Sequence, residues 1–282
     1  TIRVEKKEGY RLEWITYDSE PNDSIPAIVL IPDGVDENNP APAICIWHQH
    51  NGQWHLGKSE PAGLAGNEMH HTGVALAREG YVVLCPDALG FEDRAKGFQL
   101  QGGALERLLY LKYVVRGKTM AWKNVLDMRR AVDYISSRAD VDSERLGCYG
   151  HSMGSTHAYM VGPWEPRLNA TVCNCCLPTY AAIEEHEILH CFPNFVTGIY
   201  PEADTPDIVS LIAPRALHMN FGERDGGSPI EYVKKAMPVI RRAYESMHAE
   251  DNFSFFIEPA VGHVLSDAMW QRTKSFFAKH LG

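Results

Sequence analysis

The sequence lacks long apolar runs and clusters of basic residues. None of its apolar stretches reaches the ~20 residues that a membrane-spanning helix needs, and its first residues, TIRVEKKEGY, have no apolar core of the kind found in signal peptides. There is no run of Lys or Arg, and the 282 residues carry a net charge of −9. This balance argues against a nucleic-acid or anionic-membrane partner. We therefore expect a soluble, cytoplasmic protein, although a signal peptide that had been removed would leave no trace.

Motifs for common cofactors are also missing. No GxGxxG follows a predicted strand and no P-loop is present, so we expect no cofactor. The seven cysteines are an odd number, and most lie in apolar, strand-like runs, where cysteine behaves as a small apolar residue. This favours a reducing compartment. The cluster CNCC at 173–176 has no second pair at zinc-site spacing, and we interpret it as core and strand end.

The sequence does contain a regular alternation of short apolar runs and helical patterns. The runs predict strands at 27–32, 43–47, 81–87, 145–150, 170–176, 215–222 and 253–259. Helices are expected at 68–79, 153–161, 230–248 and 266–280, and the apolar stripe of a further helix is formed by Val125, Met128, Val132 and Ile135. The alternation predicts a single α/β domain over 1–282, with helices on both faces of a mainly parallel sheet.

Two segments do not follow this alternation, at about 91–118 and 178–212. The second is rich in Pro, Gly and aromatic residues. Long departures from an otherwise regular fold are usually lids or binding loops. We expect these segments to form walls of a substrate pocket.

The strongest local signal is the pentapeptide at 150–154, Gly-His-Ser-Met-Gly, which matches G-x-S-x-G. It ends a predicted strand and opens a predicted helix. The two glycines permit a turn so tight that Ser152 is strained and exposed at the top of the sheet. The Met153 N–H and the helix dipole would favour negative charge beside it. We interpret Ser152 as a nucleophile.

A serine hydroxyl needs a base to take its proton and a carboxylate to orient that base. In folds with this strand–turn–helix motif, the acid follows a late strand and the histidine follows the last strand. His263 stands a few residues after the last predicted strand. Asp225 and Glu223 both lie in the Gly-rich loop after the strand before it. We choose Asp225 as the acid and keep Glu223, nearer the strand end, as the alternative.

Three histidines, His48, His50 and His55, lie close together in the stretch IWHQHNGQWHLGK at 46–58. Imidazoles at short spacing can bind zinc. Backbone N–H groups in a Gly-containing loop after a strand can instead stabilise an oxyanion. Both interpretations are open at this point.

Several motifs together resemble the α/β-hydrolase superfamily, in its dienelactone-hydrolase and acetyl-xylan-esterase-like branch. They are HQHNG, GYVVLCPDALGFEDR, GHSMG, PDIVSLIAPRALHMNFGERDGGSP and the GH before the last helix. The resemblance runs from about residue 25 to the C-terminus. It implies the α/β-hydrolase fold, with Ser152 as nucleophile, Asp225 as acid and His263 as base. Dienelactone hydrolases proper use cysteine where this chain has Ser152, which points to ordinary carboxylic esters.

The resemblance also bears on the histidine loop. Many relatives carry His-Gly-x-Gly after the corresponding strand, so the loop is expected to offer the backbone N–H of His50 or Asn51 to the oxyanion, alongside that of Met153. His48 would then shape the loop through hydrogen bonds. A metal site would need a further ligand, and neighbours such as His70 and His71 cannot both face one point on a helix.

These observations predict a serine esterase with a small-molecule ester as its substrate. It would act through an acyl-enzyme on short-acyl or acetylated esters, carbohydrate esters among them. Two alternatives remain. One is a metal-dependent hydrolase that uses His48, His50 and His55, and the other is a catalytically silent α/β-hydrolase that serves as a binding protein. The sequence leaves the substrate-binding residues and the oligomeric state open.

Overall fold

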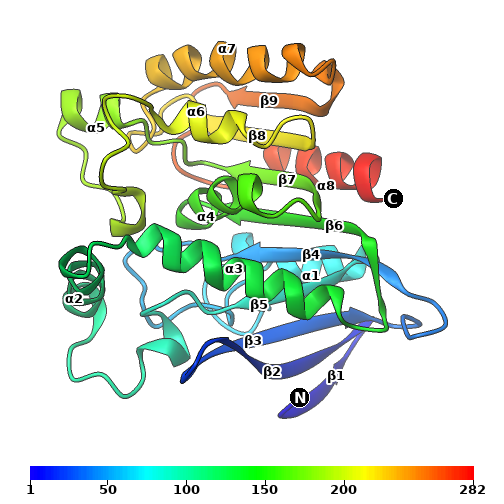
Figure 1. Ribbon diagram of the computed structural model, residues 1–282. Coiled ribbons are helices and arrows are strands. Elements are labelled where there is room, and N and C mark those ends of the chain that lie inside the picture. Colours follow the sequence, from blue (N-terminus) through cyan, green and yellow to red (C-terminus); the bar gives the residue numbers. More distant parts are fainter.

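The strands of the protein form one nine-stranded sheet in the computed structural model, which describes all residues, Thr1–Gly282 (Figure 1). The sheet order is β1-β2-β3-β5-β4-β6-β7-β8-β9, antiparallel from β1 to β5 and parallel from β5 to β9. The strands are β1 (Arg3–Lys7), β2 (Tyr10–Glu20), β3 (Asp23–Pro32), β4 (Ala41–Trp47), β5 (Val82–Pro86), β6 (Val141–His151), β7 (Leu168–Asn174), β8 (Ala216–Gly222) and β9 (Phe253–Glu258).

Helices cover both faces of the sheet. They are α1 (Thr72–Arg78), α2 (Gly102–Val115), α3 (Met120–Ser136), α4 (Met153–Val161), α5 (Tyr180–His186), α6 (Thr205–Ser210), α7 (Ile230–Ser246) and α8 (Asp267–Leu281). One apolar core lies under α3, α4 and α7, and a second lies under α1 and α8. Strands β4 and β5 are apolar throughout because both of their faces are covered.

The predicted mainly parallel α/β architecture is confirmed. All seven expected strands are present as β3 to β9, and the stripe that begins at Val125 is buried on α3. The expected helix at 68–79 is shorter, because residues Glu68–His70 form a separate 3-10 turn, η1, before α1 begins at Thr72. Strands β1 and β2 were not predicted.

The two irregular segments contain helices of their own. The first holds η2 (Glu92–Ala95) and α2, and the second holds α5, η4 (Phe192–Asn194) and α6. Figure 1 shows α2 and α5 at the left, on the side where the parallel strands reach their carboxyl ends. Active sites of open α/β sheets lie at this side. No helix in the structure has the length and apolar character needed to cross a bilayer.

Candidate active site

Ser152 lies between β6 and α4 in a strained turn. Its backbone has φ 58° and ψ −120°, which is rare for a residue with a side chain. The two flanking glycines are required sterically. A Cβ on Gly150 would lie 1.9 Å from the Gly154 carbonyl oxygen, and a Cβ on Gly154 would lie 1.9 Å from the carbonyl oxygen of Trp47. The turn therefore projects the Ser152 hydroxyl from the end of the sheet.

The structure brings Ser152, His263 and Asp225 together in one chain of hydrogen bonds. The Ser152 hydroxyl lies 2.8 Å from Nε2 of His263, and Nδ1 of His263 lies 2.7 Å from Oδ2 of Asp225. The Asp225 side chain is 3% exposed, whereas that of His263 is 40% exposed. The other carboxylate oxygen, Oδ1, accepts the Gly227 N–H at 2.9 Å. The three side chains thus have the geometry that a nucleophile, a base and an orienting carboxylate need for acyl transfer.

Glu223 has a different position. It is exposed, and its Oε2 accepts the backbone N–H of Ala260 at 2.9 Å. Its own N–H donates to the Glu258 carbonyl. Glu223 therefore ties the loop that carries His263 to the end of β8, and it makes no bond to the imidazole.

Two further imidazoles stand beside the triad. The ring of His151 is 5.2 Å from that of His263, and the ring of His70 lies 4.7 Å from that of His151, tilted by 37°. His151 is buried and accepts a hydrogen bond from the Asn174 amide on Nδ1, and burial lowers its pKa well below the usual value. Burial also lowers the pKa of His70. Neither residue was predicted to belong to the site, because a ring contact between η1 and β6 leaves no local pattern in the sequence.

The histidine loop is fixed by hydrogen bonds at its first two imidazoles. His48 is buried, accepts the Ala88 N–H on Nε2 at 3.0 Å and donates from Nδ1 to the Gln49 carbonyl. His50 accepts the Gly52 N–H on Nδ1 and donates from Nε2 to Glu106 at 2.8 Å. His48 thus shapes the loop as expected. The lone pairs that a metal would require on both rings are already used.

His55, the third histidine of the cluster, is exposed and makes no hydrogen bond from its ring. A site built from the three histidines would therefore have a single free imidazole. The donor set does not fit a metal centre, since zinc sites in proteins need at least three ligands.

Glu106 connects α2 to the histidine loop. Its Oε2 accepts both the His50 ring N–H and the Trp54 indole N–H, the latter at 2.9 Å. Its other oxygen, Oε1, is buried without a partner. The Trp54 ring in turn lies against the first two residues of α2, where a Cβ on Gly103 would approach it to 3.2 Å. The first irregular segment is therefore anchored directly to the histidine loop.

The residues predicted to form an oxyanion hole lie on two elements. Met153 is buried and begins α4, where helical N–H groups have no intrahelical acceptor. His50 and Asn51 lie in the loop after β4, with Asn51 exposed and its side chain on Gln53. Gly154 packs against the backbone of Trp47 and His48, and Gln49 is the next residue in the chain. The backbone N–H of Gln49 makes no hydrogen bond within the protein.

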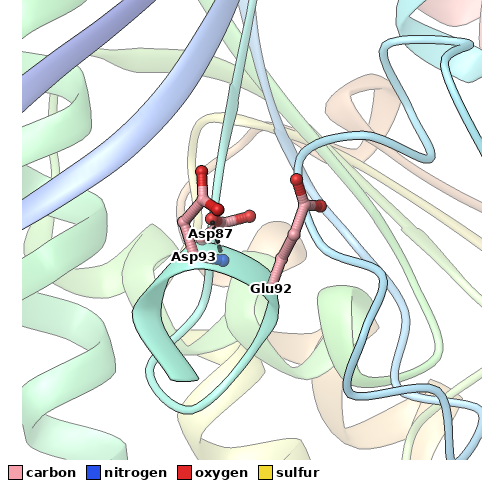
Figure 2. A group of neighbouring side chains, drawn as sticks. All are labelled: Asp87, Glu92 and Asp93. Atoms are coloured by element: carbon pink, nitrogen blue, oxygen red, sulfur yellow. Dashed lines mark hydrogen bonds between the residues drawn. The ribbon is translucent and has the colours of Figure 1, made fainter. Parts of the chain in front are cut away.

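Three carboxylates, of Asp87, Glu92 and Asp93, gather around the turn of η2 (Figure 2). Their oxygens lie within 4.8 Å of one another, as metal ligands do. The ammonium of Lys58 stands among them, at 2.8 Å from Asp87, 2.6 Å from Glu92 and 2.7 Å from Asp93. These anions raise the pKa of Lys58. The Lys58 ammonium thus occupies the position that a metal ion would take among these carboxylates. It also joins the loop after β4 to the loop after β5.

The second irregular segment reaches the site from the opposite side. His190 donates from Nε2 to the Gly227 carbonyl at 2.5 Å, next to the loop that carries Asp225. The ring of Phe192 in η4 lies against that of Tyr110 in α2, with centroids 5.0 Å apart and the planes tilted by 30°. Each segment thus contacts a loop that carries a residue of the hydrogen-bonded chain or lies beside it, and their role as pocket walls stays a prediction.

Comparisons with known proteins find a family and a relative for this chain. The model of the dienelactone hydrolase family matches residues 25–191. A Bacillus subtilis (strain 168) protein, named as a hydrolase, YtaP, is 28% identical over 291 residues, which cover 100% of this chain and 92% of that protein.

Two solved structures show the same fold at low identity. An acetyl xylan esterase from Paenibacillus sp. R4 is 15% identical with a TM-score of 0.67, covering 100% of this chain and 88% of its own. A glucuronoyl esterase from Solibacter usitatus is 15% identical with a TM-score of 0.67, covering 100% and 85%. These likenesses establish the α/β-hydrolase fold.

Proposed function

The chain belongs to the dienelactone hydrolase family, and from this membership we propose that it is a serine carboxylic-ester hydrolase. The observation that carries the proposal is the hydrogen-bonded chain from Ser152 through His263 to the buried Asp225. Hydrolysis of an ester is the simplest reaction that such a triad performs. We treat the sheet and its two irregular segments as one catalytic domain.

The reaction has two steps. His263 takes the Ser152 proton while Oγ attacks the ester carbonyl, and the alcohol leaves with that proton, so that an acyl-enzyme remains. His263 then activates water, which releases the acid and restores Ser152. Asp225 holds the imidazole in the required tautomer and stabilises the imidazolium that forms in each step.

The oxyanion of each tetrahedral intermediate accepts hydrogen bonds from backbone N–H groups. We assign one donor to Met153 and the second to the loop after β4. His50 and Asn51 were the predicted donors. The packing of Gly154 against Trp47 supports donors at the start of the loop, Gln49 and His50, over the exposed Asn51.

The substrates we propose are short-acyl esters, including acetylated carbohydrates. Support comes from the polar side chains near the triad, since His70 lies beside His151 and His190 donates to the Gly227 carbonyl in the loop of Asp225. The name of the solved acetyl xylan esterase with this fold agrees with acetylated carbohydrates as substrates, whereas that of the glucuronoyl esterase agrees only with an ester of a carbohydrate.

Turnover of model esters of increasing acyl length, before and after exhaustive EDTA treatment, tests the proposal. We expect the highest kcat/KM with acetyl esters and no loss after chelation, because the histidine loop acts through backbone N–H groups. Loss of activity on chelation, with recovery on adding zinc, would favour a metal-dependent hydrolase. Binding of esters without turnover would favour a silent binding protein.

A further inference from the structure

Helix α2 exposes an apolar stripe to solvent. Leu108, Leu111 and Val115 recur on its outer face at steps of three and four, and the last two are 48% and 85% exposed. On a helical projection, Arg107 flanks the stripe on one side and Lys112 on the other. A soluble protein rarely leaves such a stripe uncovered.

The exposed charged side chains on and just after α2 are all positive. Arg107, Lys112, Arg116 and Lys118 are all exposed, and the only acidic side chain of α2, Glu106, is buried. The only ion pair that α2 makes is the one between Glu106 and His50. The four cations therefore have no carboxylate partner, in a chain whose net charge is −9.

The second irregular segment has the opposite charge. Residues 178–212 contain six Asp and Glu and no Lys or Arg. On and just after α5, Glu184 and Glu187 are exposed, and Leu189 beside them is 87% exposed. The only ion pair from this segment joins His186 to Glu231. Its exposed carboxylates thus have no cationic partner either.

The basic and the acidic surface belong to one side of the molecule. The ring of Tyr110 in α2 contacts that of Phe192, which follows α5 in the chain. In Figure 1 both helices project at the left. Yet no ion pair joins them, so their opposite charges are not neutralised within one copy.

We propose that this side of the molecule is the interface of a homodimer, in which α2 of each copy packs against α5 of the other. A twofold axis between the two helices would create this contact twice, as isologous dimers require. Each contact would cover Leu111 and Leu189 and would bring Lys112 and Arg116 close to Glu184 and Glu187. The inference does not depend on the proposed enzymatic function.

Two other occupants fit the surface less well. If α2 packed against α2 of a second copy, the flanking cations of both helices would repel one another. An anionic lipid surface would attract α2 but would repel the acidic segment beside it. Only a partner that carries both signs complements both surfaces, and a second copy of this chain does so.

Sedimentation equilibrium of charge-reversed variants tests the pairing. The wild type should be a dimer, and its dissociation should increase in 1 M salt because exposed ion pairs are screened. K112E/R116E and E184K/E187K should each raise the dimer dissociation constant at least about tenfold, since like charges then oppose each other. Combining all four substitutions in one chain should restore the dimer, because every pair is again of opposite sign.

The control K234E/R242E reverses two exposed cations on α7 and should leave the dimer unchanged. Circular dichroism of each variant checks that it is folded. A wild type that remains monomeric at 100 µM would overturn the proposal. A variant with all four substitutions that stays monomeric would overturn it as well. Binding of monomers to vesicles of anionic phospholipid would assign the surface to a membrane instead.

Discussion

Asp225 and Glu223 lie two residues apart in the sequence, but their side chains have different surroundings and different hydrogen-bond partners. Asp225 is buried against the imidazole of His263, and Glu223 binds a backbone N–H at the surface. Only Asp225 can fix the tautomer of His263 and stabilise its charged form.

The substitution Asp225→Asn should therefore lower kcat by ~10³ to 10⁴-fold with little change in KM, because the carboxylate acts mainly in the transition state. Glu223→Gln should stay within about tenfold of the wild type, a margin of ~1.4 kcal/mol. Steady-state kinetics on one acetyl ester measures both. If the two variants exchanged behaviour, Glu223 would be the acid.

Much of the proposed site could be predicted from the sequence. The order of Ser152, Asp225 and His263 follows the order of the strands, so local motifs were enough to select them. The roles of His70, His151 and Glu106 could not be predicted. Each depends on contacts between distant segments, such as the ring contact of His70 with His151, that leave no pattern in the sequence.

Among the elements, those with strong periodicity were predicted best. The apolar strands β3 to β9 and helix α4 lie where expected. The strands are marked by short apolar runs, and the start of α4 is marked by the glycine-flanked turn at Ser152. Strand β1, RVEKK, is a charged edge strand with little apolar content, which is how natural edges avoid aggregation. Helix α2 was interpreted as an irregular wall because it is apolar on its exposed face as well as its buried one.

Lys58 joins two loops of the fold, the one after β4 and the one after β5. Its side chain is 4% exposed and forms ion pairs with three carboxylates, among them the fully buried Asp87. Lys58→Met should reduce the free energy of unfolding by about 3–5 kcal/mol, since it leaves buried charges unpaired. Urea denaturation measures this loss.

The matched control is Lys96→Met, because Lys96 pairs with Asp93 from an exposed position. This change should cost no more than about 1 kcal/mol. The effect of Lys58→Met should be smaller at pH 5.5 than at pH 8, because burial raises the pKa of Asp87 to about 7 and a protonated carboxyl needs no cation. Equal losses in the two variants would show that Lys58 has no special role.

For the whole molecule, buried histidines set the response to acid. Burial lowers the pKa of His157 to about 3 and that of His218 to about 4. Both are neutral in the folded protein, whereas the unfolded chain takes up protons below its ordinary pKa near ~6.5. The contribution of the two histidines to stability is therefore complete above pH ~6.5. It is lost as the pH falls toward the folded-state pKa values of about 4 for His218 and about 3 for His157.

Between pH 7 and pH 5 we expect each of these histidines to reduce the free energy of unfolding by about 2 kcal/mol. Urea denaturation at the two pH values measures the change. His157→Gln, which keeps an amide beside Asn124, should give a shallower dependence on pH. Equal stability of the wild type at both values would contradict this reasoning.

The central claim is that Ser152 is the nucleophile, and a fluorophosphonate probe tests it most directly. Such probes react with a serine hydroxyl only when a neighbouring base activates it. Intact-mass and peptide analysis should find one adduct per chain, on Ser152. Ser152→Ala should stay folded, lose the adduct and lose ester turnover. Labelling at another residue, or full ester hydrolysis by the alanine variant, would contradict the account.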